Sequence, residues 1–169
     1  FIRFSTSHIV VLLISLLLFI YIPYIVRKNP KALWVDSISK ALGILLIGNE
    51  LIWVLYKLSL GHTNWAEFMP FELCTINAYI VGILLLFLPS FKVFEVVYFW
   101  VMAGTVQGII TPRLFSGYPH YLFFEYFITH SGIVLATLFL IFRYNWKLTW
   151  LSLWRSMLWL QVPAFINLV

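Results

Sequence analysis

The sequence predicts an all-α membrane protein, a polytopic bundle of about six transmembrane helices. Three observations lead to this prediction. Hydrophobic residues make up 63% of the 169 residues and charged residues only 10%, whereas soluble domains carry about 25% charged residues. Six apolar stretches follow one another between short polar loops, and a spanning helix needs about 20 residues. These stretches take up nearly the whole chain, so we expect residues 1–169 to form a single transmembrane helical domain.

Each apolar stretch has a recognisable start or end. The first is too long for a signal peptide, lacks a small-residue cleavage site and ends at a basic cluster. Proline ends the third and fourth stretches, because it removes a backbone donor and clashes with the preceding turn. The chain stops inside an apolar run, so we expect one further helix beyond it. The predicted helices are His8–Val26, Ser37–Leu58, Phe71–Leu88, Val93–Ile110, Tyr121–Phe142 and a last one from Leu148.

Basic residues predict how the bundle is oriented in the membrane. With the N-terminus outside, the cytoplasmic connections hold seven basic residues and the external segments hold three, which is the asymmetry of the positive-inside rule. The seven are Arg27, Lys28, Lys31, Lys40, Lys92, Arg143 and Lys147, and the three are Arg3, Lys57 and Arg113. We therefore expect the N-terminus to lie outside.

A polar segment at 70–79 opens the third predicted helix. Glu72, Cys74, Thr75 and Asn77 lie in or beside its first turns, and polar groups that enter a membrane span are costly and usually functional. A helix start favours anions, because its first backbone N–H groups lack partners, so the thiolate of Cys74 becomes easier to reach. Cys74 is therefore a candidate nucleophile. The alternative is that it is a small buried apolar residue, as most cysteines are.

Polar residues from five helices are predicted to converge in the outer leaflet. At about 1.5 Å per residue, Cys74 lies roughly 5 Å and His130 about 13 Å below the outer boundary. If the third and fifth helices face each other, Cys74 and His130 touch, and His130 becomes the base that a cysteine nucleophile needs. Packing of the histidine against a neighbouring helix is the alternative. The residues predicted to line the substrate site around this pair are Glu50, Asn77, Gln107, Thr111 and Glu125.

Two further expectations concern packing. Gly104, Gln107, Gly108 and Thr111 recur at helical spacing in the fourth helix, which predicts a narrow face packed closely against a neighbour. Glu50 lies deep in the second helix, where a carboxyl group must be protonated or paired. We therefore expect Glu50 to face the bundle interior.

Other functional classes find little support. The four histidines lack tight ligand spacing and a single cysteine excludes multi-cysteine sites, so we predict no metal and no cofactor. Nucleic-acid binding is not expected, because no basic run is interleaved with stacking aromatics. The expected partners are membrane lipids and, as a second class, other proteins in the membrane. Arg155 in the last helix is expected to extend to the cytoplasmic interface, with contact to a lipid phosphate as the alternative.

Three ordered blocks of the sequence resemble a known family. They are Pro-Phe-Glu-Leu-Cys-Thr-Ile-Asn at 70–77, Tyr-Phe-Trp-Val-Met-Ala-Gly-Thr-Val-Gln-Gly-Ile-Ile-Thr-Pro at 98–112, and Tyr-Pro-His-Tyr-Leu-Phe-Phe-Glu-Tyr-Phe-Ile-Thr-His-Ser-Gly at 118–132. The chain is similar through them to the bacterial YwaF-like integral membrane proteins, whose eukaryotic relatives include a transmembrane acyltransferase of ether phospholipids. The resemblance implies that Cys74 carries the acyl group, that His130 is catalytic, and that the location is a bacterial plasma membrane.

We therefore expect a lipid-modifying membrane enzyme, most concretely a phospholipid acyltransferase or transacylase that uses Cys74 and His130. A site buried in one leaflet, with no soluble domain beside it, suits a lipid substrate. The alternative is a non-enzymatic protein, either a small-molecule carrier or a subunit of a larger membrane complex, that uses the same polar cluster as a ligand pocket.

Overall fold

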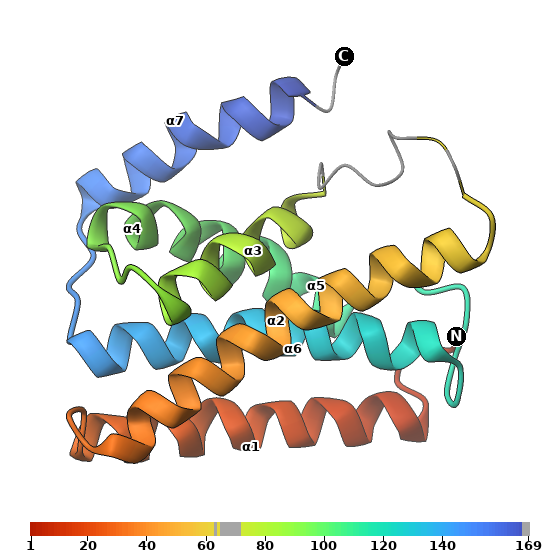
Figure 1. The fold of residues 1–169 in the computed structure, drawn as a ribbon, viewed down its shortest axis with the longest axis horizontal. Helices are drawn as coiled ribbons and strands as arrows, with labels where there is room; N and C mark the ends of the chain where they lie inside the picture. Colours follow the sequence, from red (N-terminus) through yellow and green to blue (C-terminus); the bar gives the residue numbers. More distant parts are fainter. Residues whose placement is uncertain (63, 65–71, 167–169) are drawn as a thin grey trace.

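The computed structural model describes residues 1–62, 64 and 72–166, and these residues form helices without any strand. The helices are α1 (Thr6–Lys28), α2 (Leu33–Ser59), α3 (Leu73–Leu86), a continuous helix made of α4 (Phe91–Trp100), the π-helical segment η2 (Val101–Thr105) and α5 (Val106–Ile110), then α6 (Tyr121–Tyr144) and α7 (Trp150–Ile166) (Figure 1). In the described residues, four helices are long and apolar enough to cross a membrane: α1, α2, Phe91–Ile110 and α6. The predicted fold class is confirmed.

Helix α6 forms the centre of the bundle. It packs against α1, α2, α3, η2 and α5, and its side chains Ile133, Val134 and Phe139 are almost completely buried. Helices α1 and α7 lie on opposite sides of the bundle (Figure 1), and α7 packs mainly against α4. A residue on α6 can therefore meet several other helices.

Helices α2 and α3 approach each other closely through two glycines. A Cβ atom added at Gly43 would lie 2.6 Å from Leu86, and one added at Gly82 would lie 2.8 Å from Ile47. Small residues allow such close backbone approach, and the resulting van der Waals packing favours helix association in a membrane. This contact sets how near α3, with Cys74 in its first turn, lies to α2.

Local signals explain both ends of α6. His120 caps α6, since its Nδ1 accepts the Leu122 N–H at 3.2 Å. The helix stops at Asn145, which adopts a left-handed φ of 49° that asparagine tolerates better than most residues. Helix α3 begins at Leu73 with Glu72 as N-cap. Residue 71, the first of the predicted third helix, lies outside the described residues.

The π-helical segment η2 was not predicted, and it changes the face expected on the fourth helix. The Val106 N–H bonds to the Val101 carbonyl five residues earlier, so residues four apart across this segment no longer lie on one face. Gly104 has no neighbouring atom within 4 Å of an added Cβ, and Gln107 is exposed. The prediction of one packed face through Gly104, Gln107, Gly108 and Thr111 is therefore wrong, because only part of that set meets a neighbouring helix.

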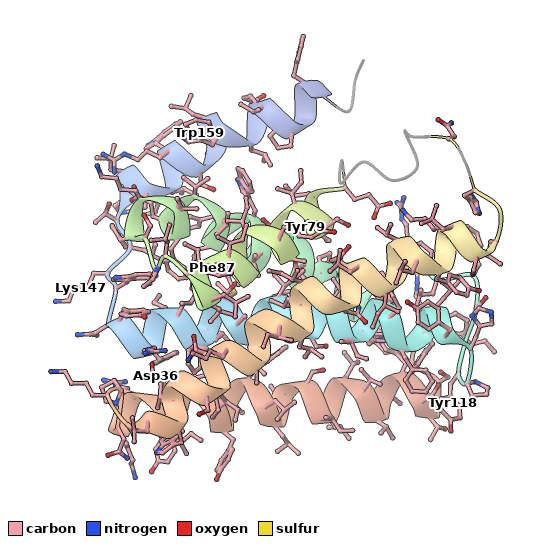
Figure 2. All side chains as sticks on the ribbon, in the orientation of Figure 1. Asp36, Tyr79, Phe87, Tyr118, Lys147 and Trp159 are labelled. Atoms are coloured by element: carbon pink, nitrogen blue, oxygen red, sulfur yellow. The ribbon has the colours of Figure 1, made fainter. Side chains whose placement is uncertain are left out.

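Charged residues distinguish the two ends of the bundle. The basic end contains Arg27 and Lys28 at the end of α1, Lys92 at the start of α4, Arg143 in the last turn of α6, and Lys147 after α6. Figure 2 shows Lys147 and Asp36 at this end and Tyr118 at the opposite end. Arg143 and Asp36 form an ion pair there that ties α6 to α2. At the opposite end of the bundle, α1 and α6 begin and α2 and α5 end.

Candidate functional site

Cys74 lies in the first turn of α3, as predicted, and its side chain is partly buried. Its Sγ is 3.9 Å from the Thr105 Oγ1 of η2. Thr105 is 1% exposed, so the thiol and this hydroxyl form a small polar contact within the bundle. π-helical turns are frequent at functional sites, and here such a turn places a hydroxyl beside the chain's one cysteine.

His130 is held in one orientation by its own helix. Its Nδ1 lies 2.8 Å from the Tyr126 carbonyl oxygen, and a carbonyl can only accept, so Nδ1 carries the hydrogen and donates it. In the neutral imidazole, Nε2 is then the nitrogen with a lone pair. The His130 and Tyr126 rings stack with centroids 3.8 Å apart.

The Nε2 edge of His130 faces α5. A Cβ atom added at Gly108 would lie 3.1 Å from His130 Cδ2 and 3.5 Å from Nε2. The Tyr126 hydroxyl donates to the Gly108 carbonyl at 2.9 Å. A glycine at this position therefore lets the imidazole and the phenol approach the α5 backbone together.

Cys74 and His130 meet neighbouring turns of the same continuous helix. The partners are Thr105 for the thiol and Gly108 for the imidazole, which lie three residues, or about 4.5 Å of helix rise, apart. Among the described residues no hydrogen bond joins Cys74 to His130. The dyad as a working pair stays a prediction.

The carboxyl groups of Glu50 and Glu125, both predicted site residues, lie beside the Thr129 hydroxyl. The Thr129 Oγ1 lies 3.5 Å from Glu50 Oε1 and 3.4 Å from Glu125 Oε1. Asn49 donates to this hydroxyl at 2.7 Å and to the Glu125 carbonyl at 3.2 Å. Glu50 is only 2% exposed, which confirms that it faces the bundle interior.

Asn77 is fully buried, and its amide nitrogen and oxygen lack hydrogen-bond partners in the described part of the chain. It lies one helical turn beyond Cys74 on the same face of α3. A buried amide without partners costs about 1–3 kcal/mol. Such a group is available to a bound molecule at this place.

Gln107 and Thr111 are not part of this cluster of contacts. The Gln107 amide donates to the Thr111 Oγ1 at 3.0 Å, and that hydroxyl donates back to the Gln107 carbonyl at 3.0 Å. Gln107 is exposed on the outer side of α5. Both residues therefore bond within their own helix end rather than to Cys74 or His130.

His8, at the start of α1, has a structural role. It is fully buried. The Phe4 N–H donates to its Nδ1 at 3.0 Å, so Nε2 carries the hydrogen and donates to the Ile109 carbonyl at 3.0 Å. Both ring nitrogens are used, and His8 ties the start of α1 to the end of α5.

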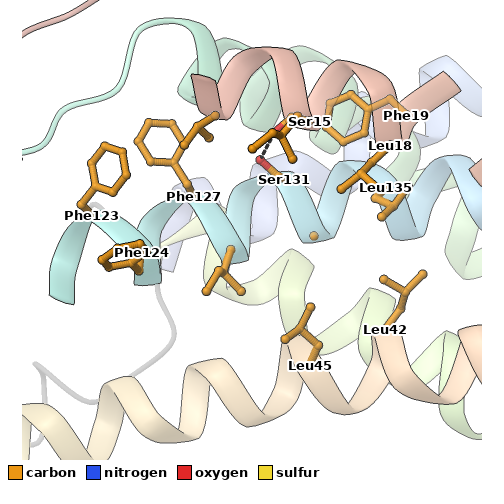
Figure 3. A pocket seen from close by; sticks show the side chains of 14 residues that line it. Ser15, Leu18, Phe19, Leu42, Leu45, Phe123, Phe124, Phe127, Ser131 and Leu135 are labelled. Atoms are coloured by element: carbon orange, nitrogen blue, oxygen red, sulfur yellow. Dashed lines mark hydrogen bonds between the residues drawn. The ribbon is translucent and has the colours of Figure 1, made fainter. Parts of the chain in front are cut away.

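An apolar pocket of about 270 Å³ lies between α1, α2 and α6 (Figure 3). Its walls are aliphatic and aromatic, and the Ser15 and Ser131 hydroxyls, the polar side chains of the lining, bond to each other at 2.9 Å. Ser131 directly follows His130 in α6. The pocket suits a hydrocarbon chain. The lining residues on α6 are Phe123, Phe124, Phe127, Ile128, Ser131, Gly132 and Leu135.

Four residues of the site were not predicted as site residues. Asn49 and Thr129 could have been found by the rule that polar residues within a span are functional. Tyr126 lies one turn before His130 on the same face of α6, but its contact with Gly108 depends on the tertiary structure. Thr105 depends on the π-helical turn, for which we find no sequence signal. No group of three or more His, Cys, Asp and Glu side chains in the described residues is arranged to hold a metal ion.

Comparison with known proteins identifies a family. The TMEM164 family matches residues 3–169. No curated protein and no solved structure matches the chain.

Proposed function

The chain belongs to the TMEM164 family of transmembrane proteins, and from this premise we propose that it is a phospholipid acyltransferase with Cys74 as its nucleophile. One observation carries the proposal. The buried Asn77 amide has no partner among the described residues and lies one helical turn from Cys74, the single cysteine of the sequence. An unpaired amide N–H beside a nucleophile is the donor that an oxyanion requires.

The proposed reaction has two balanced steps. The Cys74 thiol loses its proton to His130, and its sulfur attacks the ester carbonyl of a phospholipid; the C–O bond breaks, and the lysophospholipid alkoxide leaves with the proton returned by His130. A second lysophospholipid hydroxyl then attacks the thioester while His130 takes its proton. The new ester forms, and the proton restores the thiol.

His130 suits the role of base because its tautomer is set. The Nδ1–H bond to the Tyr126 carbonyl leaves Nε2 as the accepting nitrogen, and stacking on Tyr126 limits rotation of the ring. A catalytic base is oriented by a third group, and here that group is the Tyr126 main-chain carbonyl rather than a carboxylate. The Glu50 and Glu125 carboxyl groups lie instead around Thr129, where they are proposed to contact the polar part of the lipid.

The apolar pocket beside Ser131 is the proposed place for the acyl chain. Its α6 wall extends from Phe123 to Leu135, a helix rise of about 18 Å. Burying each methylene of a chain there contributes about 0.8 kcal/mol. In this proposal a lipid enters laterally from the bilayer and binds there through its chain, with its ester directed toward the polar residues.

The test is acyl transfer by the purified protein in micelles. A phospholipid with an alkyne-tagged acyl ester should leave a hydroxylamine-sensitive tag on Cys74 and pass it to an added lysophospholipid. Cys74→Ser and His130→Ala should each lower the initial rate by at least about 100-fold. The double variant should be little slower than either single variant, since the effects of residues that act as a catalytic unit are non-additive. His120→Ala, at the exposed histidine that caps α6, is the control: it loses a helix cap but should keep its turnover per folded molecule.

Two outcomes would contradict the proposal. If the wild-type protein releases every bound lipid unchanged and Cys74 stays unmodified, the protein is a carrier or a subunit of a larger complex. If Cys74→Ser and His130→Ala lower the melting temperature but leave turnover per folded molecule unchanged, both residues serve packing alone.

A further inference from the structure

A second cavity lies at the basic end of the bundle, away from the candidate site. It is a groove of about 580 Å³ between α4 and α7. Two hydrogen bonds fix the distance between these helices: the Trp100 indole N–H donates to the Ser156 carbonyl at 3.0 Å, and the Ser156 hydroxyl donates to the Val96 carbonyl at 2.8 Å. The groove is therefore part of the packed fold.

The ion pair in this groove was not expected from the sequence. Glu95 is 3% exposed, and both of its oxygens are used: Ser152 donates to Oε2 at 2.6 Å and Arg155 Nη1 donates to Oε1 at 2.7 Å. Arg155 was expected to extend to the cytoplasmic interface, with contact to a lipid phosphate as the alternative. It is instead held over the groove by Glu95, with its side chain still 49% exposed.

The groove has a surplus of positive charge at its polar end. Lys92 and Arg155 both line it, and the one carboxylate, Glu95, is already bonded by Arg155 and Ser152. A guanidinium has five N–H donors, so a single bond to Glu95 leaves Arg155 with donors for a second anion. Two cations against one carboxylate make a net charge of +1.

The remaining walls are apolar. They consist of the side chains Ile80, Val93, Val96, Val97, Trp100 and Trp159. From Lys92 to Trp100 the α4 wall covers about 12 Å of helix rise, so the groove is cationic near the basic end and hydrophobic further into the bundle. An amphiphile with an anionic head matches this division.

We propose that the groove between α4 and α7 binds an anionic phospholipid, with its phosphate at Lys92 and Arg155 and one acyl chain along Val96, Trp100 and Trp159. The basic end supports a lipid as the occupant, because basic residues gather where a helix leaves the bilayer and anionic headgroups lie at that depth. Basic pockets between membrane helices bind such headgroups. The proposal does not depend on acyl transfer at Cys74.

The experiment measures lipid affinity of the full chain by native mass spectrometry. Phosphatidylglycerol and phosphatidylcholine with identical acyl chains are titrated separately into the protein in neutral detergent. We expect the wild-type protein to bind phosphatidylglycerol about fivefold more tightly, and Lys92→Gln to remove that preference, since a basic residue near the membrane surface contributes about this factor. Lys147→Gln makes the same charge change at an exposed position of the basic end outside the groove, and it should keep the preference.

Three results would overturn the proposal. Equal wild-type affinity for both lipids would mean that the groove does not distinguish lipids by the charge of their headgroups. An equal loss in Lys92→Gln and Lys147→Gln would mean diffuse attraction rather than a site. Full competition by glycerol 3-phosphate would mean that a soluble phosphate, not a lipid, is the occupant. Trp159→Ala tests the apolar part of the groove separately from its cationic part, since it should lower the affinity for both lipids by a similar factor.

Discussion

Replacing Gly108 by alanine tests the packing of His130 and Tyr126 against α5. The added Cβ would lie 3.1 Å from His130 Cδ2 and 3.1 Å from the Tyr126 hydroxyl. Neither ring can retreat easily, because His130 is bonded to the Tyr126 carbonyl and Tyr126 to the Gly108 carbonyl. Adding a methyl group to such a packed contact costs about 1–3 kcal/mol.

The helix propensity of alanine partly offsets this cost. Alanine is about 0.8–1.0 kcal/mol better than glycine within a helix, so the net loss for Gly108→Ala is about 0–2 kcal/mol. Gly104→Ala is the matched control on the same continuous helix, since nothing lies within 4 Å of its added Cβ. It should gain up to about 1 kcal/mol. The difference between the two variants is therefore about 1–3 kcal/mol.

Thermal unfolding of the purified protein measures this difference. For a chain of this size 1 kcal/mol corresponds to about 2–4 °C in Tm, so Gly108→Ala should melt about 2–12 °C below Gly104→Ala. If the two variants melt at the same temperature, the close contact of His130 and Tyr126 with α5 is incorrect. The same variant should also lose acyl transfer if His130 is the base, because the methyl group displaces its ring.

Three more predictions concern other parts of the bundle. His8→Ala should lower the free energy of unfolding by about 1–3 kcal/mol, measured by denaturant titration, because a buried carbonyl of α5 loses its donor; a neutral result would contradict the buried contact. Thr129→Val should cost a similar amount by removing the hydroxyl that bonds Glu50, while Thr137→Val, whose hydroxyl bonds only its own helix, should cost less. A cysteine at Asn29 in a cysteine-free background should react with an impermeant thiol reagent only from the cytoplasmic side; labelling from outside would reverse the proposed orientation.

Much of the helical organisation followed from local sequence. The predicted helix from Tyr121 to Phe142 differs from α6 by two residues at its end, because hydropathy over about 20 residues and the residues that stop a helix are local properties. The place of Cys74 in the first turn of α3 and the burial of Glu50 also followed. Each depended on one helix and on the high cost of an unpaired polar group in the membrane.

Contacts between helices were much harder to predict. In α1, the buried residues include His8 and Ser15, whereas Leu13 and Leu17 are exposed. A membrane helix is apolar on nearly every side, and lipid chains are as apolar as leucine, so the hydrophobic pattern does not identify the packed face. The pairing of Arg155 with Glu95 was missed for this reason.

The sequence by itself determined a helical membrane protein with a polar region around Cys74 and His130, because hydropathy, helix length and the cost of buried polar groups add up along the chain. The tertiary structure alone decided which groups meet: the π-helical turn that brings Thr105 to Cys74, and the glycine that admits His130 and Tyr126 to α5. These contacts depend on the rotation of each helix about its axis. Packing against neighbouring helices sets that rotation, and no single helix encodes it.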